Sequence, residues 1–217
     1  LNFDEIRRNC SKKQNTYKNL LRQIFIANKP TQFILSDTGV SIHIPSFVLH
    51  EINKSLCPNI YLVKKGGYVG NYDVTMIIDS SVSCFNNISS YHSYQTMMAL
   101  FSGLYAVDIN CVDVIIATNS EPKVLCYNTP STKAFDDKSP FWPSLFNFLE
   151  ENSFSSCNLE ASLHYALNLK KRRLDSTSYV YILTDGLYQK EQKEIIRNQI
   201  ANLENYGIRT LCIGIGI

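Results

Sequence analysis

Hydrophobic and polar positions divide most of the chain into two alternating kinds of segment. Short apolar runs such as 72–78 (YDVTMII) and 179–183 (YVYIL) are typical of buried strands. Longer segments such as 93–106 and 190–206 carry apolar residues at helical spacing. This alternation predicts an α/β fold with a mostly parallel sheet and helices on its faces, and strands this apolar are expected to be buried on both faces.

The elements that precede the predicted sheet do not follow its regular alternation of strand and helix. We expect its strands at 72–78, 112–117, 123–127, 179–183 and 209–215, and its helices at 93–106, 143–151, 159–171 and 190–206, the last ending at Gly207. Upstream, the pattern predicts a helix over 15–27, strands over 32–36 and 40–44, a helix over 46–53 and a strand over 60–65. The chain is therefore divided into an N-terminal α+β extension, 1–69, and a main domain, 70–217.

Composition limits the classes of function. The chain of 217 residues is 45% hydrophobic, but no uninterrupted apolar run reaches about 18 residues, so no membrane span is predicted. The 21 basic and 19 acidic residues leave a formal charge of +2, and no nucleic-acid partner is expected on that basis. The residues do not fix the oligomeric state.

Cysteine usage favours an intracellular protein. The seven cysteines are scattered singly, with no CxxC pair, which indicates neither a zinc ribbon nor a disulfide framework. The basic run from Lys170 to Arg173 lies at a predicted helix end, where cations offset the carbonyl dipoles; a nuclear signal is the alternative. Nucleus and cytoplasm both stay open.

Candidate chemistry follows two of the predicted strands. Asp79, Ser81 and Ser83 are spaced two apart on one tight loop, and Asp185 follows the strand 179–183. Because the carboxyl ends of parallel strands share one edge of a sheet, these side chains are expected to meet there. Carboxylates and hydroxyls suit Mg²⁺, which takes about six oxygen ligands and retains several waters.

The segments YDVTMIIDSSVSC and YVYILTDGLY together resemble the metal-ion-dependent adhesion site of a von Willebrand factor type A domain. The resemblance implies a doubly wound, Rossmann-like, mostly parallel sheet with one short antiparallel edge strand. It also implies that the chain stops before the family's last helix and strand. Asp79, Ser81, Ser83 and Asp185 match the family's metal site residue by residue.

The family's remaining ligand is a threonine, which commonly begins a T-N-x-x-x-A-L sequence. The corresponding stretch here begins Cys157-Asn158, so a thiol stands where the hydroxyl is expected, and Ser156 is the neighbouring oxygen that can replace it. The resemblance implies Mg²⁺ or Mn²⁺ as the cofactor and a protein partner that supplies a Glu or Asp side chain.

A second resemblance covers about residues 39–83. The order GVSIHIPSFVLHEI, IYLVKKGG, NYDVTMIIDSSVS is similar to the segment that leads into the terminal type A domain of midasin-type AAA ATPases. It implies a larger, ATPase-coupled parent chain.

Two alternatives stay open. In the first, the domain is a metal-free scaffold whose Asp and Ser residues cap the following helix. In the second, Asp79 is the nucleophile of a phosphoryl-transfer enzyme. Such enzymes need a lysine at a later strand end, and none directly follows a predicted strand beyond Asp79; a P-loop is also absent. We therefore expect the domain itself not to be an enzyme.

Overall fold

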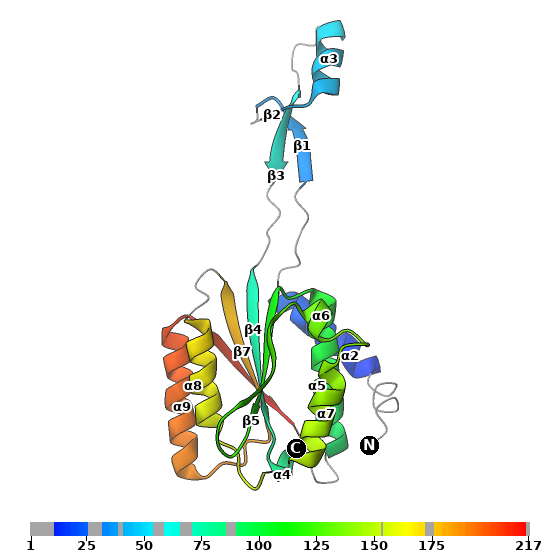
Figure 1. Cartoon of the computed structure of the whole chain (residues 1–217). Helices are drawn as coiled ribbons and strands as arrows, with labels where there is room; N and C mark the ends of the chain where they lie inside the picture. The colour runs from blue at the N-terminus through cyan, green and yellow to red at the C-terminus, as the bar shows by residue number, and fades with distance from the viewer. Residues whose placement is uncertain are drawn as a thin grey trace. The chain divides into compact units, whose positions relative to one another are not determined.

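Two units make up the chain, Leu1–Phe25 with Asn71–Ile217 and Ile26–Gly70. They are seen in a computed structural model (Figure 1), which describes residues 11–25, 32–38, 41–53, 59–65, 71–85, 90–152, 154–171 and 176–215. The sequence predicts a single boundary, at 69/70. In the structure, the segment up to Phe25, including the N-terminal helix, belongs to the main unit.

A five-stranded sheet in the order β6-β5-β4-β7-β8 forms the centre of the larger unit. Every neighbouring pair is parallel except β5 and β6, which are antiparallel. The fold is therefore the predicted α/β arrangement, with the short antiparallel strand at one edge. Its strands are β4 (Tyr72–Asp79), β5 (Cys111–Ala117), β6 (Lys123–Thr129), β7 (Thr177–Thr184) and β8 (Arg209–Gly214).

Helices cover both faces of this sheet (Figure 1), and each face has its own core. Successive strand side chains point to opposite faces, so Val74, Met76 and Ile78 of β4 enter one core and Ile77 enters the other. On the first face lie α5 (Ser90–Val107), α6 (Ser131–Ala134) and α7 (Phe141–Glu151); on the second lie α8 (Leu159–Lys170) and α9 (Lys190–Asn205).

The edge strands differ from the central ones. In β4, β5 and β7 almost every residue is buried, as their apolar sequences predict. Burial on both faces was also expected of 209–215, and there the prediction is wrong: β8 lies at the sheet's edge and Leu211 is 41% exposed. Gly207, with φ of 74°, ends the preceding helix in the left-handed conformation that glycine tolerates.

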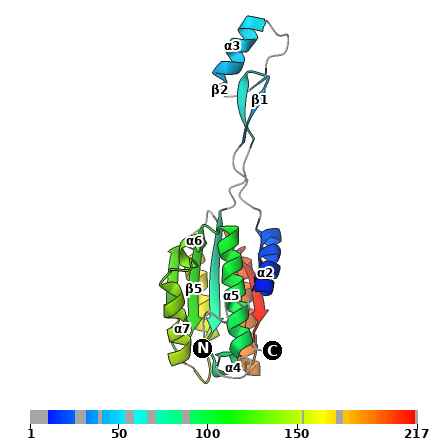
Figure 2. The same cartoon turned by 90° about the vertical axis from the view of Figure 1, so that its right-hand side faces the viewer.

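The first described helix, α2 (Ser11–Ile24), packs against α5 in the same unit as the sheet, and the two lie side by side in Figure 2. Leu21 and Phe25 are fully buried in the core. The close approach depends on Gly103, because a Cβ there would lie 2.7 Å from Leu21 Cδ1. The order of elements along the chain does not predict this contact, because the second unit is inserted between the two helices.

The second unit contains a small antiparallel sheet in the order β1-β3-β2. Its elements are β1 (Gln32–Ser36), β2 (Ser41–Ile42), α3 (Ile44–Asn53) and β3 (Tyr61–Lys65), as the sequence predicts. None of the described helices combines the length and apolar character needed to cross a bilayer.

Candidate metal centre

The first loop of the site follows β4, at the edge marked in Figure 1 by the short helix α4 (Val82–Phe85). Asp79 is 1% exposed, and its Oδ1 accepts the Ser81 backbone N–H at 3.0 Å, which fixes the carboxylate in a tight turn. The hydroxyls of Ser81 and Ser83 lie 3.0 Å apart. The two serine hydroxyls therefore lie together, on a turn that is anchored to the Asp79 carboxylate.

A second loop, which precedes α8, is held beside the first. Phe154 O accepts the N–H of Val82 at 2.8 Å, and the Asn158 N–H donates to Thr118 O, at the end of β5, at 2.6 Å. The Asn158 side chain accepts the Ala161 N–H at 3.0 Å and so caps the helix. These backbone contacts bring Cys157 to the edge where Asp79 lies.

Cys157, which the type A resemblance aligns with a threonine, supplies no oxygen. Its side chain is 5% exposed, and its Sγ lies 3.6 Å from Ser80 Oγ. Burial, together with the nearby Asp79 carboxylate, raises the pKa of the Cys157 thiol to about 12, so the thiol keeps its proton at neutral pH. Ser156 is exposed and lines the adjacent cavity.

The third loop follows β7 and carries Asp185. One of its carboxylate oxygens, Oδ1, accepts the Leu187 N–H at 2.9 Å. The other, Oδ2, is buried and has no hydrogen-bond partner among the residues that the structure describes. Ligand atoms of Asp79, Asp185 and Cys84 all lie within 4.8 Å of one another. The two carboxylates predicted to meet at this edge are thus brought together.

Three residues of this cluster were not predicted: Cys84, Thr184 and Tyr188. The Thr184 hydroxyl donates to Asp79 Oδ2 at 2.7 Å, and the Tyr188 hydroxyl donates to the same oxygen. Cys84 is buried, and burial, with Asp79 as a further cause, raises the pKa of its thiol to about 12. Only Thr184 had a visible signal, since it ends the strand beside Asp185.

The electrostatics of the cluster suit a cation. Within the described ranges, Asp79 and Asp185 form no salt bridge, and the donors to Asp79 are a backbone N–H and two hydroxyls, all neutral. The unpartnered Oδ2 of Asp185 and the paired serine hydroxyls are hard oxygen donors. This donor set fits Mg²⁺ or Mn²⁺, which Asp79, Ser81, Ser83 and Asp185 would hold.

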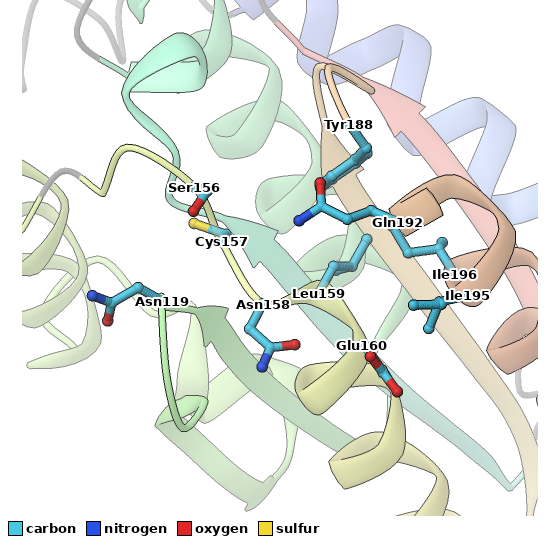
Figure 3. Close-up of a pocket in the computed structure, with 10 residues that line it drawn as sticks. All are labelled: Asn119, Ser156, Cys157, Asn158, Leu159, Glu160, Tyr188, Gln192, Ile195 and Ile196. Atoms are coloured by element: carbon cyan, nitrogen blue, oxygen red, sulfur yellow. The ribbon is translucent and has the colours of Figure 1, made fainter. Parts of the chain in front are cut away.

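A cavity of about 290 Å³ adjoins the centre on the side of α8 and α9 (Figure 3). Side-chain amides and apolar groups share its walls, and Cys157 and Tyr188 belong to both the cavity and the metal centre. Its remaining lining residues are Asn119, Ser156, Asn158, Leu159, Glu160, Gln192, Ile195 and Ile196.

No protein family matches the sequence, and no curated protein matches it. Among solved structures, the chain is similar to manganese-loaded TRAP protein from Plasmodium vivax, at 17% identity and a TM-score of 0.52, over 67% of this chain and 57% of TRAP. It is also similar to the N-terminal domain of TFIIH p34, at 13% identity and a TM-score of 0.49, over 67% of this chain and 81% of that one.

A von Willebrand factor type A protein from Catenulispora acidiphila is a further neighbour, at 16% identity and a TM-score of 0.42, over 70% of this chain and 34% of that one. At these identities the likeness to TRAP shows the fold alone, a mostly parallel α/β sheet flanked by helices. This is the fold that the type A resemblance predicts.

Proposed function

We propose that the domain is a metal-dependent protein-recognition module. Asp79, Ser81 and Ser83 hold Mg²⁺ or Mn²⁺, and Asp185 binds the ion directly or through a water. The partner completes the coordination with a Glu or Asp side chain. Two carboxylates only just balance the charge of the ion, and when one of them binds through a water the ion remains electrophilic and attracts an incoming anionic oxygen.

One observation carries this proposal: two neighbouring carboxylates share a sheet edge with two serine hydroxyls, and no described basic side chain pairs with them. Burying carboxylates without a counter-charge is costly, so the arrangement favours a bound cation. The edge is also the one at which open α/β sheets bind ligands.

The wider setting is part of the proposal. The resemblance of about residues 39–83 to midasin-type AAA ATPases supports an intracellular parent chain whose ATPase modules act on a partner bound here. The domain itself would bind rather than catalyse. A phosphoryl-transfer role finds less support, because buried Lys170 ends α8 and pairs with Asp73, at the other end of β4.

A metal-free scaffold is the second candidate, and Cys157 favours it. The thiol replaces an oxygen ligand, and the Asp79 carboxylate already accepts three hydrogen bonds from the protein. In this reading the loop residues serve only to shape the turn.

Calorimetric titration of Mg²⁺ and Mn²⁺ decides between the two. We expect saturable binding to the wild-type chain, loss of binding in Asp79→Ala, and no change in Glu151→Ala, which removes an exposed carboxylate elsewhere. Peptides with an exposed Glu or Asp would then bind only without chelator. Absence of heat at millimolar metal would reject the metal-dependent module and leave the scaffold.

A further inference from the structure

Tyr188 occupies an acceptor position on Asp79 Oδ2, one of the two oxygens through which this carboxylate can bind a metal ion. Its hydroxyl donates to Asp79 Oδ2 and also lies 2.8 Å from Thr184 Oγ1, which donates to the same oxygen. A carboxylate oxygen offers about two acceptor positions, so both positions on Oδ2 are filled by protein hydroxyls. A cation can reach this oxygen only if one hydroxyl leaves.

The two hydroxyls differ in their freedom to leave. Thr184 ends β7, is 9% exposed, and accepts the Gly186 N–H at 3.0 Å. Tyr188 lies outside helix and strand, beyond Gly186, whose φ is 73°, and next to Leu187, which is 76% exposed. Tyr188 also lines the cavity of about 290 Å³ (Figure 3), which offers its ring a place to move.

We infer that Tyr188 sets the metal affinity of the site, because its phenol and the ion compete for Asp79 Oδ2. The hydroxyl proton is the positive end of the donor, and it points at the oxygen where the cation would bind. Ion uptake therefore displaces the Tyr188 hydroxyl from Asp79 towards the cavity. This inference rests on the proposed function, since it concerns the same metal.

The Tyr188 phenol carries its proton at physiological pH, so it can compete with the ion for Asp79. A tyrosine phenol ordinarily titrates at about pH 10, so it is protonated at neutral pH. The phenol therefore retains the proton that it donates, and it stabilises the carboxylate in the metal-free state. Neutral phenol and dication are alternative partners of one oxygen.

The direct test is Tyr188→Phe, which removes the hydroxyl and keeps the ring. By calorimetry we expect this variant to bind Mn²⁺ about tenfold more tightly than the wild type, because no hydrogen bond to a charged acceptor has to be broken first. Tyr206→Phe is the matched control; this ring is 59% exposed, and its variant should bind as the wild type does.

A second measurement reports on the phenol itself. Addition of Mn²⁺ to the wild type should produce a near-ultraviolet tyrosine difference band, because a buried hydroxyl leaves its carboxylate partner. The band should disappear in Tyr188→Phe and persist in Tyr206→Phe. A purely structural Tyr188 would produce no such band, so this readout also decides the matter should Tyr188→Phe fail to fold.

The outcomes separate the inference from the proposed function. Equal or weaker Mn²⁺ binding by Tyr188→Phe, in a chain whose wild type binds Mn²⁺, overturns the competition and leaves the metal site in place. No Mn²⁺ binding by either chain rejects the proposed function, and the inference with it.

Discussion

The two ends of β4 carry similar groups of side chains with different counter-charges. Asp73 is the second residue of the strand and Asp79 its last, and the two are about 20 Å apart along an extended chain. Each belongs to a set of two aspartates and a cysteine whose ligand atoms lie within 4.8 Å of one another. Judged by their carboxylates and thiols alone, both ends could hold a metal ion. The difference between them must therefore lie in the surrounding side chains.

At the Asp73 end the cation is part of the chain. Lys170 is 3% exposed and forms an ion pair with Asp73. Burial lowers the pKa of the Lys170 ammonium, although the charges of Asp73 and Asp113 act in the opposite direction. Asp113 also accepts the Asn128 N–H at 2.8 Å and the Thr75 hydroxyl at 3.3 Å. This end therefore contains a basic side chain of the protein beside its carboxylates.

At the Asp79 end the described donors are neutral. Backbone and hydroxyl groups orient the carboxylate but leave its charge in place. The comparison teaches that the presence of a basic side chain, rather than the number of acids, distinguishes a structural cluster from a candidate metal site.

The largest expected effect comes from removing the built-in cation. Lys170→Met leaves Asp73 buried without its partner, and we expect the free energy of unfolding to fall by about 3–5 kcal/mol. Urea denaturation measures this loss. Lys171→Met is the control, because Lys171 is exposed and should contribute little. Unchanged stability in Lys170→Met would mean that the ion pair does not balance this end.

The sequence predicts the meeting of Asp79 and Asp185 but not the ion pair of Lys170 with Asp73. Apolar runs ending in carboxylates place the aspartates at one edge, because strand direction alone determines that meeting. Lys170 was interpreted as a cation at a helix end, and it does end α8, but the structure also buries it against Asp73. Which side chain at the end of a helix meets a neighbouring strand depends on tertiary packing. The local sequence pattern does not predict that packing.

Tyr188 escaped prediction for a related reason. A loop residue beyond Gly186 has no periodicity to follow, and its contact with Asp79 joins segments far apart in the sequence. The fold was easier to predict from the sequence than the site, since periodicity and composition predicted nearly every strand of the sheet and the helices that cover it. The elements α2 and β8 were also predicted, but the packing of α2 on α5 and the exposure of β8 were not, because both depend on which neighbours the chain finds in space.

Metal-dependent stabilisation is the next effect in size. A ligand at a hundred times its dissociation constant stabilises the native state by about 2.7 kcal/mol. Mn²⁺ should therefore raise the melting temperature of the wild type, and chelator should reverse the shift. Asp79→Ala should show no shift, whereas Lys170→Met, altered at the other end of β4, should keep it. A shift that survives in Asp79→Ala would place the ion elsewhere.

Restoring the oxygen missing from the second loop should have a smaller effect. Cys157→Thr replaces a protonated thiol with a hydroxyl, which Mg²⁺ prefers, and we expect about tenfold tighter Mg²⁺ binding, or about 1.4 kcal/mol. Calorimetry on this variant and on Cys111→Ser, which alters a thiol at the Asp73 end, provides the comparison. Equal gains in both would show that the two ends are not chemically distinct.

The smallest effect tests whether a hydroxyl matters where a cation is already present. Thr75 is fully buried, and its bond to Asp113 is long, at 3.3 Å. Valine has nearly the same shape, and Asp113 keeps the Asn128 N–H and the nearby charge of Lys170. Thr75→Val should therefore cost only about 0.5–1 kcal/mol in urea denaturation and leave Mn²⁺ binding unchanged. A loss well above this range would mean that the hydroxyl, more than Lys170, stabilises Asp113, and the two ends of β4 would then rely on the same kind of neutral donor.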